Sequence, residues 1–169
     1  MDLQTAVGLI EKGVDSKNTQ AWADLGAGDG LFTKALSKAL PRGSSIVAID
    51  KNSSSLSKIQ VEPGIQLQTK ALDFVATALA LNDLDGILMA NSLHYVKDQA
   101  KFLSDLKKHL KPSGRFIIVE YNTDRWNQWV PYAISFETLQ SLNAGDTIKL
   151  ADAPSAYHKE GMYAAQILP

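Results

Sequence analysis

The chain has 169 residues, about the size of one domain, and its 45% hydrophobic and 21% charged residues are typical of a globular protein with an ordinary core. Its formal net charge of −1 argues against a dominant attraction to nucleic acid or to an anionic membrane surface. Because the chain has no cysteine, disulfides, cysteine-ligated zinc and thiol nucleophiles are excluded.

The N-terminal segment lacks the features of a targeting peptide. It has no basic start, and Glu11 and Lys12 interrupt its short apolar run. No apolar run approaches the roughly 20 residues that span a bilayer. We therefore expect a single domain over residues 1–169, located in the cytoplasm and without a membrane partner.

The first half of the chain alternates between amphipathic helices and short apolar strands. Apolar residues three and four positions apart predict helices over residues 3–14 and 31–40. Apolar runs predict strands at residues 21–25, 46–49 and 65–68. Asn52 or Ser53 could cap a further helix that reaches Ile59 and ends before Pro63 and Gly64.

The second half continues the pattern and then departs from it. We predict helices over residues 75–81, 97–110 and 136–142, and strands at 87–90 and 116–119. His109 and His158 are expected at the surface. Residues 147–150 and 163–168 read as two strands without a helix between them, which indicates an antiparallel pair. The alternation before them implies a parallel sheet with helices on both faces.

A glycine-rich stretch, D-L-G-A-G-D-G at residues 24–30, joins the first predicted strand to the next helix. Glycines at such a junction let the backbone turn sharply and let a ligand approach closely. In an open α/β sheet, ligands bind at the carboxyl ends of the strands. The spacing differs from a dinucleotide-binding fingerprint, because Leu31 stands where that pattern needs its third glycine.

Five stretches, in register along nearly the whole chain, resemble motifs of class I S-adenosylmethionine-dependent methyltransferases. Residues 24–30 resemble motif I of that family, and residues 46–50 (IVAID) resemble its second strand with a terminal acid. Residues 70–74 (KALDF) resemble the loop after the third strand. Residues 85–96, ending in NSLHYV, resemble the fourth-strand motif, and residues 110–116 (LKPSGRF) resemble the turn into the fifth strand.

The resemblance implies a doubly wound α/β fold, with a seven-stranded, mostly parallel sheet of order 3-2-1-4-5-7-6 and an antiparallel C-terminal hairpin. It implies S-adenosylmethionine as cofactor and S-adenosylhomocysteine (SAH) as product. In that family's pattern Asp24 would position the methionine amino group, Asp50 would bind the ribose hydroxyls and Asp73 would accept from the adenine amino group. The cofactor-binding residues expected from the resemblance are Asp24, Gly26, Ala27, Gly28, Gly30, Asp50, Lys51, Asp73, Phe74 and Asn91.

Simpler interpretations stand beside these roles. The glycines could form a turn needed only for folding, and Asp24, Asp50 and Asp73 could each cap the helix that follows. The sequence also departs from the family pattern at two positions. Lys51 stands where the family often has an apolar residue against the adenine, and Ser113 lies within the L-K-P-x-G turn.

His94 is the candidate catalytic residue. By the resemblance it lies beside the transferred methyl group, where an imidazole can take a proton from a hydroxyl or an amine at neutral pH. A structural hydrogen bond is the alternative. The expected substrate-pocket residues are His94, Tyr95, Tyr121, Trp126 and Trp129. An aromatic wall suits a flat or apolar substrate, although such side chains could equally pack a loop over the core.

We therefore predict an enzyme that transfers a methyl group from S-adenosylmethionine to an oxygen, nitrogen or carbon nucleophile of a small substrate. A non-catalytic cofactor-binding or regulatory subunit stays open as an alternative. An NAD(P)-dependent oxidoreductase is a further alternative, against which the glycine spacing and the hairpin count. With no sizeable insertion to form a lid, a homodimer or a protein partner could complete the site. No metal site is predicted, because the three histidines lie far apart in the sequence.

Overall fold

The computed structural model describes residues 1–142 and 146–168, and within them the strands form one sheet. The strands are β1 (Ala21–Leu25), β2 (Ser45–Asp50), β3 (Gln66–Ala71), β4 (Leu84–Ala90), β5 (Leu110–Tyr121), β6 (Asp146–Ala153) and β7 (Met162–Leu168). Their order is β3-β2-β1-β4-β5-β7-β6. Strands β1 to β5 pair in parallel, whereas β7 runs antiparallel to both β5 and β6. The predicted seven-stranded fold with its C-terminal hairpin is confirmed.

The one-domain organisation over residues 1–169 stays a prediction, and part of that range, residues 143–145 and 169, lies outside the described residues.

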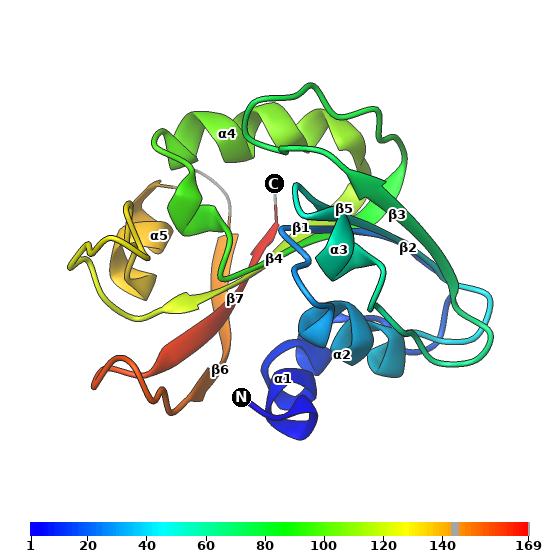
Figure 1. Cartoon of the computed structure of the whole chain (residues 1–169), viewed down its shortest axis with the longest axis horizontal. Coiled ribbons are helices and arrows are strands. Elements are labelled where there is room, and N and C mark those ends of the chain that lie inside the picture. The colour runs from blue at the N-terminus through cyan, green and yellow to red at the C-terminus, as the bar shows by residue number, and fades with distance from the viewer. Residues whose placement is uncertain (143–145, 169) are drawn as a thin grey trace.

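Helices cover both faces of the sheet (Figure 1). The α-helices are α1 (Leu3–Ile10), α2 (Leu31–Ala39), α3 (Ser53–Leu56), α4 (Gln99–Leu106) and α5 (Phe136–Leu142), and the 3-10 helices are η1 (Glu11–Gly13), η2 (Leu93–Tyr95) and η3 (Lys107–His109). Helices α1 and α2 pack on one face, and α4 and α5 pack on the other. None of the helices in the described residues is long and apolar enough to cross a membrane.

The middle strands are buried on both faces, which explains their almost unbroken apolar sequences. In β5, Phe116 and Ile118 point into the core beneath α4, whereas Ile117 and Val119 point into the core beneath α1 and α2. This alternation follows the two-residue period of a strand. The polar ends of such strands therefore collect at the edges of the sheet, where loops can build a site.

Side-chain caps fix where several helices begin. Asp2 accepts a hydrogen bond from the backbone N–H of Thr5 at the start of α1, and Asp98 accepts from that of Lys101 at the start of α4. Asn52 caps α3, which decides between the two residues that the sequence offered for this role. Each cap satisfies an N–H group that has no partner inside its helix.

Two expectations were wrong, and they concern segments that contact each other. Residues 75–81 form turns and coil instead of a helix. His109, expected at the surface, is buried, and its Nδ1 lies 2.6 Å from the carbonyl oxygen of Leu81. This contact and the burial of Leu81 tie the end of the segment to η3. A helix this short is too weak to form against such packing. The helix predicted over residues 97–110 is shorter, since α4 passes into η3 at Lys107.

Candidate functional site

A cavity of about 540 Å³ opens where the loops after β1, β2, β3 and β4 meet, and we call it the strand-end cavity. Seven of the residues predicted for the site line it: Gly26, Asp50, Lys51, Asp73, Phe74, Asn91 and Tyr95. Its remaining lining residues, which the sequence did not reveal, are Asn52, Ser55, Val75 and Ser92. Parallel strands bring these loops to one edge of the sheet, and this is why residues distant in sequence share one cavity.

The glycine-rich loop passes close to the loop after β4. A Cβ atom at Gly26 would lie 2.4 Å from the Cβ of Ser92, and the φ of Gly26 is +83°, so glycine is required on both grounds. The Ser92 hydroxyl donates to the carbonyl of Leu25 at 2.6 Å and so closes this contact. Gly28 also has a positive φ, +52°, but its missing Cβ would meet nothing within 4 Å. The loop is therefore tight at its base and open at its tip.

The backbone of the same loop is anchored to β2 and packed against the segment after α3. The N–H groups of Gly26 and Ala27 donate to the carbonyl of Ile49, at 2.8 and 3.0 Å. Ala27 is buried. Gly30, which immediately precedes α2, lies against the side chain of Ile59. Ala27, Gly28 and Gly30 thus shape the loop without lining the cavity themselves.

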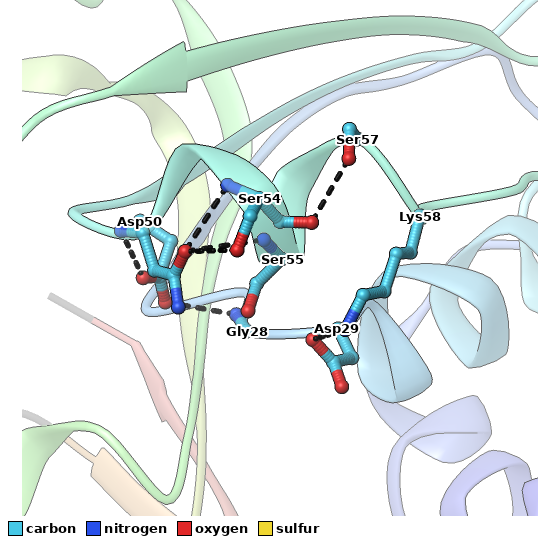
Figure 2. A network of polar contacts seen from close by, with 8 residues as sticks. Gly28, Asp29, Asp50, Ser54, Ser55, Ser57 and Lys58 are labelled. Carbon is cyan, nitrogen blue, oxygen red and sulfur yellow. Dashed lines mark hydrogen bonds and ion pairs between the residues drawn. The ribbon is translucent and has the colours of Figure 1, made fainter.

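Asp50 joins the glycine-rich loop to the loop after β2 (Figure 2). Its Oδ2 accepts from the N–H of Gly28 at 2.9 Å, and its Oδ1 accepts from the N–H of Asn52 at 2.8 Å. Asp50 therefore does not cap α3, whose cap is Asn52. Each carboxylate oxygen keeps a second acceptor position, so Asp50 can still receive hydrogen bonds from a ligand in the cavity.

The rim beside Asp50 carries polar contacts between α3 and the glycine-rich loop. The Oδ1 of Asn52 accepts from the backbone N–H groups of Ser54 and Ser55. The ammonium of Lys58 lies 3.4 Å from the carboxylate of Asp29, and Figure 2 shows these two side chains pointing toward each other. Both charged groups are largely exposed, so this ion pair adds little stability. Hydrogen bonds with the side chains of Ser55 and Lys58 nevertheless lower the pKa of Asp29.

Asp24 lies beneath the glycine-rich loop and does not line the cavity. It is 1% exposed, and its Oδ2 accepts a hydrogen bond of 2.6 Å from the hydroxyl of Thr33 in α2. Burial raises the pKa of Asp24 to about 7, with the charge of Asp50 as a further cause and the Thr33 hydrogen bond acting in the opposite direction. Burial therefore disfavours the ionised form of Asp24.

Asp73 and Phe74 form the part of the cavity that follows β3. The Oδ1 of Asp73 accepts from the N–H groups of Val75 and Ala76, at 2.9 and 3.3 Å. This carboxylate therefore caps a turn, whereas the alternative considered from the sequence was that it caps a helix. The ring of Phe74 is buried, and its centroid lies 6.0 Å from that of the Phe102 ring. Packed in this way, Phe74 forms part of the wall of the strand-end cavity. Both residues face the cavity from one side.

Asn91 directly follows β4, and both its backbone conformation and its side-chain environment are unusual. Its φ is +52°, and its N–H donates to the carbonyl of Val119 at 2.8 Å. Its side-chain Oδ1 is buried and has no hydrogen-bond partner among the described residues. A buried acceptor without a partner is costly, so this oxygen is suited to a donor supplied by a ligand.

His94 lies in η2 and is paired with a carboxylate that the sequence analysis missed. Its Nδ1 is 2.7 Å from Oε2 of Glu120, and its backbone N–H donates to Oε1 of the same residue at 3.1 Å. Both side chains are buried. The Nε2 of His94 is also buried and has no partner in the part of the chain that the structure describes. A signal for Glu120 existed, because a carboxylate ends the apolar run at 116–119.

The predicted aromatic wall is only partly assembled. Tyr121 and Trp129 line a cavity of about 570 Å³, the aromatic cavity, which is completed by Asn127, Val130, Tyr157 and His158. A connecting cavity of about 580 Å³ shares Tyr121 and Tyr157 with the aromatic cavity and shares Asn91 with the strand-end cavity. Trp126 is 76% exposed and lines none of these three cavities.

Metal ligands are not gathered in the described residues, where no group of three or more histidine and acidic side chains is placed to hold an ion.

Comparison with known proteins gives a family and a fold. Residues 23–116, more than half of the chain, match the family model of a methyltransferase domain. Among curated protein sequences the chain has no significant match. Solved structures similar to it include DhpI in complex with SAH, at 16% identity and a TM-score of 0.69, covering 98% of this chain and 84% of that one.

Two further solved structures resemble the chain to a comparable degree. A SAM-dependent methyltransferase from Aquifex aeolicus is 16% identical with a TM-score of 0.66, covering 99% of this chain and 98% of that one. The plantazolicin methyltransferase BpumL in complex with SAH is 13% identical with a TM-score of 0.65, covering 98% and 82%. At these identities the likeness shows a shared fold.

Proposed function

The chain belongs to the methyltransferase domain family, and from this premise we propose that it transfers a methyl group from S-adenosylmethionine to a small acceptor molecule. The strand-end cavity carries the proposal. It combines a carboxylate with free acceptor positions, a backbone approach that a Cβ would fill, and the buried Oδ1 of Asn91 that lacks a partner. These features fit a nucleoside with an amino acid attached, which offers hydroxyl, amino and ammonium donors.

We assign the cofactor contacts to residues that line this cavity. Asp50 accepts from the two ribose hydroxyls, and Asp73 accepts from the adenine amino group while Phe74 packs beside the ring. Asn91 accepts from the amino acid part. Asp24 acts from below, by holding α2 beside the glycine-rich loop through Thr33, and a bound ammonium would favour its ionised form.

When bound, S-adenosylmethionine supplies a methyl group that its sulfonium has already activated. The protein then has to align the acceptor and exclude water. We propose that His94 also takes the acceptor's proton. Glu120 accepts from Nδ1, so a neutral His94 keeps its proton there and presents a lone pair at Nε2. Because Nε2 is buried, a neighbouring side chain has to move before the acceptor reaches it.

Calorimetric titration with S-adenosylmethionine, SAH, NAD and NADP tests the cofactor. We expect the first two to bind and Asp50→Ala to abolish their binding, while Asp29→Ala, which removes an exposed carboxylate from the same loop, leaves it unchanged. Circular dichroism of both variants checks that they fold. Binding of a nicotinamide cofactor alone would overturn the proposal. Cofactor binding without SAH production from any acceptor would favour a non-catalytic subunit.

A further inference from the structure

Four aromatic side chains line the aromatic cavity, and two of them are largely exposed. Trp129 is 73% exposed and Tyr157 is 83% exposed, and they line the cavity together with Tyr121 and His158. Large apolar rings in water are unfavourable, and a group of them around a concavity is typical of a binding site. The volume of about 570 Å³ lies within the range of small-molecule pockets.

Hydrogen bonds order the backbone that carries Trp129, and two of the other rings pack against each other. The backbone N–H of Trp129 donates to Oδ1 of Asn127 at 2.8 Å, and Asn127 and Val130 exchange two backbone hydrogen bonds of 3.1 Å. The centroid of the His158 ring lies 4.5 Å from that of the Tyr121 ring. Walls that are already ordered reduce the entropy lost when a ligand binds.

The lining also restricts the chemistry of the occupant. None of the lining residues of the aromatic cavity is a lysine, an arginine, an aspartate or a glutamate. The polar groups available are the amide of Asn127, the hydroxyls of Tyr121 and Tyr157, and the imidazole of His158. An anionic ligand would lose its hydration there without gaining a cationic partner. A ligand whose nucleophile is a protonated amine has no lone pair with which to accept the methyl group. The cavity therefore favours an uncharged, planar molecule that can also make a few hydrogen bonds.

We propose that the acceptor of the methyl group is a small, uncharged, planar aromatic molecule that carries a hydroxyl or amino group and binds in the aromatic cavity. The proposal rests on the methyl-transfer function of the strand-end cavity, which the connecting cavity joins to this site through Asn91, Tyr121 and Tyr157. The acceptor oxygen or nitrogen forms a bond to the methyl carbon while the carbon–sulfur bond breaks and its electron pair stays on sulfur. His94 lines none of the three cavities, so the acceptor's proton passes to its Nε2 once a neighbouring side chain has moved.

The probe pair that tests this proposal is 2-naphthol and its saturated analogue decahydro-2-naphthol, titrated into the full chain in the presence of SAH and followed by ligand-observed NMR. We expect 2-naphthol to bind about tenfold more tightly, because only the planar molecule stacks on the rings. Trp129→Ala weakens 2-naphthol binding roughly three- to tenfold. Trp126→Ala removes an equally exposed tryptophan from the same loop but outside the cavity, and leaves binding unchanged.

The outcomes separate this proposal from the proposed function. Calorimetry with S-adenosylmethionine alone reports on the strand-end cavity, which Trp129 does not line. If the cofactor binds but neither naphthol does, or both bind equally, the aromatic-acceptor proposal fails and the methyltransferase function stands. If the cofactor itself does not bind, the proposed function fails. If Trp129→Ala turns a dimer into a monomer and 2-naphthol does not bind, the rings form a subunit interface instead.

Discussion

Replacing Asp24 by asparagine gives a pH-dependent change in stability whose sign follows from the structure. Asp24 is 1% exposed, and burial raises its pKa from 3.8 to about 7. Asparagine has nearly the same shape and keeps an oxygen that can accept from the Thr33 hydroxyl, but it carries no charge at any pH. The variant therefore removes the titration of this one group and leaves the packing around it in place.

Between pH 4 and pH 7 the unfolded chain has lost the Asp24 proton while the folded protein still holds it. At this one group the folded state binds more protons in this window. The contribution of Asp24 to the free energy of unfolding therefore falls as the pH rises and levels off above pH 7. A pKa difference of about three pH units corresponds to about 4 kcal/mol. Asp24→Asn lacks this loss, so its stability relative to the wild type rises by up to about 4 kcal/mol across the window.

Urea unfolding of both proteins at several pH values between 4 and 8 measures this difference, and subtraction cancels the titration of all other groups. Asp29→Asn serves as the control, because Asp29 is exposed and hydrogen bonds with Ser55 and Lys58 lower its pKa. Its difference from the wild type is constant above pH 5, where this carboxyl is ionised in both states. A constant difference for Asp24→Asn as well would refute the argument that burial holds this carboxyl protonated.

Other predictions concern the glycine-rich loop and the buried pair. Gly26→Ala places a Cβ 2.4 Å from that of Ser92 at a φ of +83°, so we expect urea unfolding to show a loss of about 2–4 kcal/mol. Gly8→Ala, in the middle of α1 with nothing within 4 Å, gains about 0.5–1 kcal/mol, and equal effects of the two changes would contradict this explanation. Glu120→Ala leaves two buried donors of His94 unpaired, and we expect a loss of about 2–3 kcal/mol in the same assay. His94→Gln lowers kcat for an acceptor that yields SAH by a factor on the order of 10² to 10⁴, while calorimetry shows unchanged S-adenosylmethionine binding. Loss of that binding instead would indicate a structural role.

The parts of the fold that could be predicted from the sequence are those encoded by neighbouring residues. The apolar runs of the strands follow from their burial on both faces, and the strand-end cavity gathers residues from motifs that each lie within a few positions, such as Asp50 and Lys51. The caps of the helices are equally local.

The features that escaped prediction depend on contacts between distant residues. The end of the segment 75–81 is held by His109, 28 positions beyond Leu81, which contacts the carbonyl of that leucine. Glu120 is paired with His94 across 26 positions. Tyr157 enters the aromatic cavity from the loop between β6 and β7, where no pattern in the sequence points to a ligand. Only the folded chain brings these groups together.

A crystal structure of the chain with SAH tests the central claim most directly. We predict the nucleoside in the strand-end cavity, with the ribose hydroxyls on Asp50 and the adenine beside Phe74 and Asp73. SAH bound elsewhere, or bound in this cavity without a contact to Asp50, would contradict the proposed role of this carboxylate and the account of the site built on it.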